Sequence, residues 1–194
     1  IVLRNPTKVI ISDSCPYGLG GMTTNGRAWR LFIPPYAPFY SKDEVNNVLE
    51  FLGIAITLRL ELKELLEKGE SQEVILALAD NSSAVHWLFK SGKLEKGSLY
   101  FKATNFIARS IAKWMMNSEN FLCSQHIKGE YNHISDLLSF QGEVRVRGKG
   151  GQRQPKVHSL TRDNPPNVVL TQRIKTFYPQ LVPKRFHVSP LDNK

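Results

Sequence analysis

The sequence predicts an α/β domain with a mixed five-stranded sheet, three antiparallel strands followed by parallel ones, flanked by helices. Short, continuous apolar runs at residues 8–13 and 73–79 are typical of buried strands, and each leads to an aspartate. Helical patterns separate the later strands. Such helical crossovers allow the first and fourth strands to lie parallel.

The first three strands are expected to form an antiparallel meander. Residues 19–23 and 28–33 flank Asn25 and Gly26, a pair that favours a two-residue type I′ turn. Prolines directly after residue 33 end the third strand.

A long helix follows the meander. Ser41 and Glu44 fit a capping box, and the helix is expected to end near Lys68 or Gly69. Its first half is apolar on nearly every side, which indicates a buried helix.

Helix and strand then alternate. The expected elements are a short helix capped by Ser82 or Ser83, a helix at 103–116, a strand at 121–127 and a helix capped by Asn132 that ends near Ser139.

The chain divides at about residue 140. Residues 141–194 carry 11 of the 26 Lys/Arg residues and only 3 of the 17 Asp/Glu residues. We expect a basic, Gly- and Pro-rich linker with a short helix after Asn164. Basic tails commonly bind polyanions because counterions are released, but a solvated linker is an equal alternative.

Several protein classes are disfavoured. The sequence begins at Ile1 and has no signal peptide, so we expect an intracellular, non-secreted piece of a longer chain. The longest apolar stretch, residues 45–58, is interrupted by Glu50 and is shorter than the roughly 20 residues of a membrane span. Two cysteines are too few for a disulfide framework.

Asp13 and Asp80 share a context, because each stands where an apolar strand ends. Parallel neighbouring strands would bring both to one edge, where open α/β sheets bind ligands. Two like charges repel, so a cation between them would keep both ionised. The alternatives for each residue alone are a helix N-cap for Asp80 and an ordinary turn for Asp13.

Glu50 and Asp136 are two further candidates. Glu50 is the only charge in a buried helical stretch, and an unpaired carboxylate there costs several kcal/mol. Gly53, one turn later, leaves room for a close approach. Alternatively, Glu50 reaches solvent, and Asp136 interacts favourably with the helix dipole from the first turn of the last helix. Acidic oxygens without clustered Cys or His suit Mg²⁺, and two such ions can cleave phosphodiesters.

Four motifs together resemble the ribonuclease H domains of retroelements, most closely those that follow a reverse transcriptase in Ty3-like and DIRS-like elements. They are the Asp and Gly-rich turn at 13–21, the glutamate helix at 47–52, the segment 79–85 and the segment 126–139. The resemblance covers roughly residues 7–140.

This resemblance implies a ribonuclease H-like catalytic domain at residues 1–140. Its expected activity is endonucleolytic cleavage of the RNA strand of RNA/DNA hybrids during reverse transcription. The resemblance implies that two Mg²⁺ ions, or Mn²⁺ as a substitute, are held by four carboxylates: Asp13, Glu50, Asp80 and Asp136.

The same resemblance implies partners. Ser14, Asn81 and Ser82 would contact the hybrid, and the polymerase domain of the same polyprotein would be a neighbour. The connection before Asn132 is too short for the mobile, histidine-bearing loop of cellular ribonucleases H, and His133 is not expected to be catalytic.

A second basic segment lies between the two middle helices. Lys90, Lys93 and Lys96, with aromatic residues interleaved, fall where some ribonucleases H carry a hybrid-binding protrusion. The alternative is a solvated turn beside ordinary core aromatics.

Two other functions stay open at this stage. One is a catalytically inactive ribonuclease H-like module that binds nucleic acid or acts as a spacer in a polyprotein, which the intact acidic residues disfavour. The other is a different nuclease or an integrase of the same fold, which the fourth motif disfavours.

Overall fold

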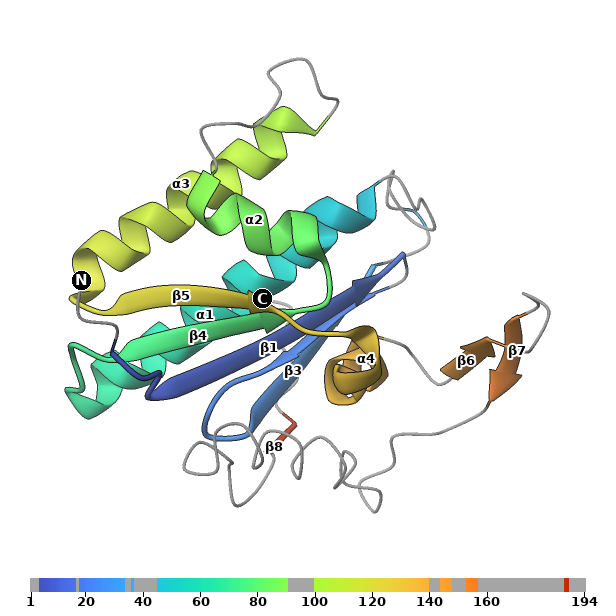
Figure 1. The fold of residues 1–194 in the computed structure, drawn as a ribbon, viewed down its shortest axis with the longest axis horizontal. Helices are drawn as coiled ribbons and strands as arrows, with labels where there is room; N and C mark the ends of the chain where they lie inside the picture. The colour runs from blue at the N-terminus through green and yellow to red at the C-terminus, as the bar shows by residue number, and fades with distance from the viewer. Residues whose placement is uncertain are drawn as a thin grey trace.

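A mixed sheet forms the centre of the computed structural model (Figure 1). The structure describes residues 4–16, 18–33, 36, 45–90, 100–139, 144–147, 153–156 and 187–188. The main strands are β1 (Lys8–Cys15), β2 (Gly18–Met22), β3 (Arg27–Phe32), β4 (Val74–Ala79) and β5 (Phe121–His126). Their order is β5-β4-β1-β2-β3.

The strand directions agree with the prediction. β1, β2 and β3 are antiparallel neighbours, whereas β4 runs parallel to both β1 and β5. A two-residue strand, β8 (His187–Val188), adds to the free edge of β3. The five-stranded sheet expected from the sequence is therefore confirmed, with β8 as an addition.

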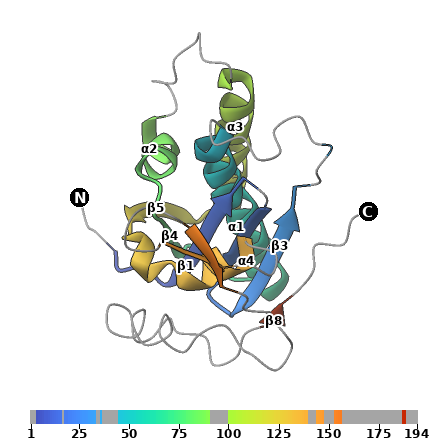
Figure 2. The same ribbon diagram turned by 90° about the vertical axis from the view of Figure 1, so that its right-hand side faces the viewer.

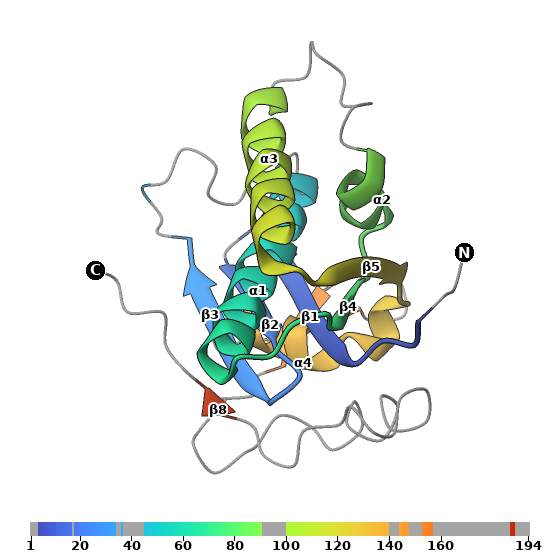
Figure 3. The same ribbon diagram turned by 90° about the vertical axis from the view of Figure 1, so that its left-hand side faces the viewer.

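Helices cover both faces of this sheet. On one face lie α1 (Asn46–Lys68), α2 (Ser82–Lys90) and α3 (Phe101–Ser118), and α4 (His133–Ser139) lies on the other (Figure 2). α1 and α3 run side by side (Figure 3). None of the helices in the described part of the chain has the length and apolar character that crossing a bilayer requires.

The side chains of β1 point alternately to the two faces of the sheet and contribute to two separate cores. Ile10 packs in the cluster that contains Phe51 of α1, whereas Val9 and Ile11 pack in the cluster that contains Leu138 of α4. Successive residues of a strand point to opposite faces. Asp13, in step with Val9 and Ile11, therefore belongs to the α4 face.

Glycines in β2 let both layers come close to the sheet. A Cβ atom on Gly20 would overlap Leu138 of α4, and one on Gly21 would overlap Thr57 of α1 and the Trp29 indole. The Gly-rich sequence of β2 thus allows a helix to pack tightly on each side of the strand.

Two local predictions need correction. The β2–β3 connection is a three-residue loop, because Gly26 N–H bonds the Thr23 carbonyl and only Gly26 has positive φ, at 77°. A type I′ turn would require Asn25 to adopt positive φ as well. The cap of α2 is Asn81, whose Oδ1 accepts the Ala84 N–H at 3.0 Å, and not Ser82 or Ser83.

The described residues include only part of the long helix and of the tail that the sequence predicts. α1 ends as expected, with Gly69 in the left-handed conformation at φ 66°. The proposed capping box at Ser41 and Glu44 and the helix expected after Asn164 lie outside the described residues. A small antiparallel hairpin, β6 (Val144–Arg147) with β7 (Arg153–Lys156), forms where the sequence indicated irregular chain.

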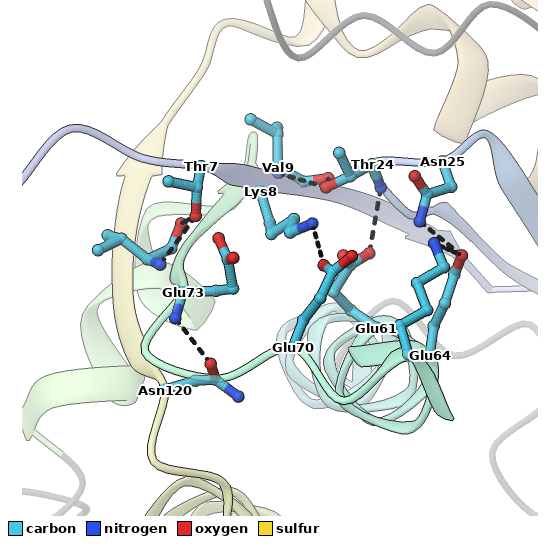
Figure 4. Close-up of polar contacts among 12 residues, drawn as sticks. Thr7, Lys8, Val9, Thr24, Asn25, Glu61, Glu64, Glu70, Glu73 and Asn120 are labelled. Carbon is cyan, nitrogen blue, oxygen red and sulfur yellow. Dashed lines mark hydrogen bonds and ion pairs between the residues drawn. The ribbon is translucent and has the colours of Figure 1, made fainter. Parts of the chain in front are cut away.

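The far end of α1 holds a buried glutamate that the sequence did not single out (Figure 4). Glu61 is 0% exposed. Its Oε2 accepts the Thr24 N–H at 3.2 Å, and its Oε1 has no hydrogen-bond partner. The pKa of Glu61 is raised to about 7, because burial and the charge of Glu64 raise it more than the Thr24 N–H, Lys8 and Lys68 lower it.

We predict that Glu61 makes folding pH-dependent. Its folded pKa of about 7 lies above the ordinary value of 4.5, so its contribution to stability is complete below about pH 4.5 and is lost as the pH rises through 7. Between pH 5 and 8 the loss is about 2 kcal/mol. Glu61→Gln should remove this pH-dependent loss. Between pH 5 and pH 8, the free energy of unfolding measured in urea should therefore rise by this amount in the variant relative to wild type.

The exposed Glu67 provides the matched control. Glu67→Gln should change the free energy of unfolding equally at pH 5 and pH 8. A Glu61→Gln effect that is the same at both pH values would contradict the prediction.

Candidate metal centre

Three carboxylates from three different elements meet at one edge of the sheet. Asp13 lies in β1, Asp80 directly follows β4, and Asp136 lies in the first turn of α4. One oxygen from each lies within 4.8 Å of the others. Among the described residues, this is the only group of three or more acidic, His or Cys side chains that close together.

The pairing of β1 with β4 brings two of these residues together. Ile11 is the partner of Leu78 in the parallel register, and Asp13 and Asp80 each lie two residues further along. The shared register places both aspartates at the same level. This is the arrangement that the two apolar runs predict, although β1 continues past Asp13 to Cys15.

Glu50 approaches the centre from α1. Its side chain is 2% exposed, and its Oε1 accepts the Ser14 N–H at 3.2 Å. A Cβ atom on the neighbouring Gly53 would lie 3.4 Å from the Ser12 Cβ, an ordinary van der Waals contact, so α1 packs directly against β1 beside Glu50. Glu50 is not part of the 4.8 Å group, but its carboxylate interacts electrostatically with Asp13 and Asp80.

All four carboxylates have raised pKa values. Burial is the chief cause for each; for Asp13 the charges of Glu50, Asp136 and Asp80 add to it. The pKa of Glu50 rises to about 8 and that of Asp136 to about 6. The ion pairs of the described region, Lys8–Glu70, Lys63–Glu67 and Lys68–Glu64, lie elsewhere.

This donor set fits a hard divalent cation. Every donor is a carboxylate oxygen, which Mg²⁺ and Mn²⁺ prefer over the nitrogen and sulfur ligands of zinc sites. The buried Glu50 Oε2 has no hydrogen-bond partner, so it is free to accept a metal or one of its waters. A cation would also relieve the mutual repulsion that adds to the effect of burial on the pKa values of Asp13, Glu50 and Asp136.

Polar side chains surround the carboxylates. The predicted contact residue Ser14 directs its hydroxyl toward Asn46, with 3.2 Å between Ser14 Oγ and Asn46 Oδ1. The predicted Asn81 donates to Asn47 Oδ1 at 2.8 Å. Asn46 and Asn47 were missed, although two amides one turn before a buried glutamate are a usable signal in the sequence.

Asp80 has three neighbours that the sequence did not assign. His126 Nε2 lies 3.0 Å from the Asp80 carbonyl oxygen, and a Cβ atom on Gly129 would lie 3.0 Å from Asp80 Oδ2. Asn132 donates to the Ser12 carbonyl at 3.2 Å, and its side chain also hydrogen-bonds Asp80 and lowers that pKa.

The predicted basic segment is only partly described. Ser82 begins α2, and Lys90 is exposed at its end, whereas Lys93 and Lys96 lie outside the described residues. Trp87 packs edge-on against Phe51, with 5.7 Å between ring centroids. That aromatic residue therefore belongs to the core, as the alternative interpretation held.

Comparisons with known proteins find similarity in structure alone. No family model and no curated protein matches the sequence. LC11-RNase H1, solved in complex with an RNA/DNA hybrid, is 19% identical, covers 68% of this chain and 93% of its own, and gives a TM-score of 0.49. RNase H1 from Halobacterium salinarum NRC-1 is 14% identical, with coverages of 68% and 91% and a TM-score of 0.44.

A third neighbour is a larger protein. The prototype foamy virus protease-reverse transcriptase is 12% identical, with 71% of this chain matching 21% of that one and a TM-score of 0.40. The strand order β3-β2-β1-β4-β5, antiparallel and then parallel, decides the fold class. The chain has a ribonuclease H-like fold.

We predict that divalent ions stabilise this fold most at high pH. Since the folded pKa of Glu50 is about 8 and its ordinary value 4.5, its charge destabilises the metal-free protein increasingly as the pH rises from 4.5 to 8. In EDTA, Tm should fall between pH 5 and 8. Mg²⁺ should raise Tm more at pH 8 than at pH 5.

Glu50→Gln provides the control, because it removes one of the repelling charges. This variant should show a flatter Tm profile in EDTA and a smaller response to Mg²⁺. A wild-type protein whose Tm responds to Mg²⁺ equally at both pH values would contradict the prediction.

Proposed function

We propose that this protein is a ribonuclease H, an endonuclease that cleaves the RNA strand of RNA/DNA hybrids. The observation that carries the proposal is the meeting of Asp13, Asp80 and Asp136 within 4.8 Å, with the buried Glu50 beside them. A purely structural role would not require four carboxylates whose burial raises their pKa values.

Asp13, Glu50, Asp80 and Asp136 would hold two Mg²⁺ ions, with Mn²⁺ as a substitute. Such a pair supplies an activated water and stabilises the leaving oxygen of a phosphodiester. The protein itself contributes fixed ligand positions: strand pairing aligns Asp13 with Asp80, and the Ser14 N–H orients Glu50.

His126 is the proposed proton acceptor. A carbonyl oxygen can only accept, so the nitrogen 3.0 Å from the Asp80 carbonyl, Nε2, carries a hydrogen. Nδ1 of the neutral ring is then the free acceptor. The ring is exposed and borders Asp80, where it can take a proton from water or return one to the leaving group.

The polar rim is the proposed hybrid-binding surface. Asn46, Asn47 and Asn81 supply amide groups beside the carboxylates, and such groups distinguish RNA by its 2′-hydroxyls. Ser14 is buried, and its hydroxyl would act by orienting the Asn46 amide. We place Ser82 at the start of α2 on the same rim. Lys90, together with Lys93 and Lys96, would contact the phosphate backbone.

The biological setting is proposed from the motifs. The resemblance to Ty3-like and DIRS-like elements supports a role in reverse transcription, beside the polymerase domain of the same polyprotein inside the cell. The competing function is a catalytically inactive binding module, and an assay of hybrid cleavage separates the two functions.

We predict Mg²⁺-dependent cleavage restricted to hybrids. Labelled RNA/DNA hybrid, duplex DNA and duplex RNA are incubated with the protein and Mg²⁺. Only the RNA strand of the hybrid should be cut, and Asp13→Asn should lower the rate by at least about 10³-fold because it removes a shared metal ligand. Binding without cleavage would support the inactive module.

The exposed Glu119→Gln variant is the matched control, since it also removes one carboxylate charge. Its cleavage rate should equal that of wild type. Circular dichroism of Asp13→Asn distinguishes a lost metal ligand from a lost fold.

We predict that His126 acts through proton transfer. His126→Ala should lower kcat by about 10²-fold with a smaller change in KM. His126→Gln retains a donor for the Asp80 carbonyl but has no titrating group, so it should be as impaired as the alanine variant. Near-normal kcat in His126→Gln would reduce His126 to a structural role.

A further inference from the structure

Ser139 links the last turn of α4 to β1. It is 0% exposed, and its Oγ lies 2.8 Å from Asp13 Oδ2 and 3.0 Å from the Asp136 carbonyl oxygen. A hydroxyl has one hydrogen, and the shorter contact, to an ionisable oxygen, is the stronger one. Ser139 therefore donates mainly to Asp13, and this donation opposes the rise in the pKa of Asp13.

The backbone of Ser139 is held in place independently of the carboxylates. The Cys15 thiol donates to the Ser139 carbonyl at 3.3 Å. A Cβ atom on Gly18 would lie 2.5 Å from the same oxygen, so β2 packs directly against it. The position of the Ser139 hydroxyl is thus set by packing of α4 on the sheet.

We propose that Ser139 is a positioning residue for the metal centre. Its hydroxyl occupies one lone pair of Asp13 Oδ2 and fixes the rotation of that carboxylate. Because Ser139 follows Asp136 by one turn of α4, the same contact fixes the spacing between α4 and Asp13. This inference rests on the proposed function in one respect, that the carboxylates bind divalent ions.

The neighbouring Ser135 is a matched control. It lies on the same helix and is also 0% exposed, but its Oγ has no hydrogen-bond partner. Ser135→Ala and Ser139→Ala remove the same atom from equally buried sites. A difference between them isolates the contact with Asp13 from the packing of α4.

The test is a titration of the full chain with Mn²⁺, followed by the electron paramagnetic resonance signal of the free ion. Ser139→Ala should weaken Mn²⁺ binding by about 10-fold, the lower range for residues that orient metal ligands. Ser139→Thr, which retains the hydroxyl, should restore binding to within about 3-fold of wild type. Ser135→Ala should leave it unchanged.

Hybrid cleavage provides the second measurement. In Ser139→Ala the Mg²⁺ concentration for half-maximal activity should rise by the same factor as the Mn²⁺ dissociation constant, while kcat at saturating Mg²⁺ recovers most of its wild-type value.

The outcomes separate the two proposals. Equal Mn²⁺ affinity in wild type and Ser139→Ala overturns the role of Ser139 and leaves the nuclease untouched. Wild type that binds Mn²⁺ without cutting hybrids overturns the nuclease, and the affinity ratio still decides the role of Ser139. Wild type that binds no Mn²⁺ overturns both.

Discussion

The parallel pairing of β1 with β4 is the constraint on which the site depends. It sets Asp13 and Asp80 at one level, two residues beyond the paired Ile11 and Leu78. Both strands are buried on both faces, and a shift by one residue would exchange the α1 face for the α4 face. The apolar packing that stabilises the sheet therefore also fixes the register of the two carboxylates.

The other two carboxylates reach this edge because their helices, α4 and α1, pack closely on opposite faces of the sheet. Gly20 lets Leu138 and thus α4 lie close to β2, which brings Asp136 to the α4 face of Asp13. On the opposite face α1 packs directly against β1, with Gly53 next to Ser12, and this packing brings Glu50 to the same edge. The close packing of α4 on Gly20 and of α1 on β1 thus determines where the charged side chains meet.

Much of this could be predicted from the sequence, because it follows from local pattern. Apolar runs identified the buried strands, and the lone charge in an apolar helix identified Glu50. The meeting of Asp13 and Asp80 could be predicted, but individual side-chain hydrogen bonds between distant segments could not. Ser139 and His126 come into contact with Asp13 and with the Asp80 carbonyl only through tertiary packing. The predicted type of the β2–β3 turn was wrong because an Asn-Gly pair also suits the three-residue loop.

Glu50 and Glu61 show why a raised pKa alone does not identify a site. Both are buried on α1 with one oxygen lacking a partner, and burial is the main cause of each shift. Their surroundings differ. Glu61 has the acid Glu64 beside it but also Lys8 and Lys68, whose charges lower its pKa, whereas the charge that acts on Glu50 is that of Asp80, a second acid. A single proton neutralises Glu61, whereas the several acids that converge on Asp13 form the donor set that a multivalent cation would neutralise.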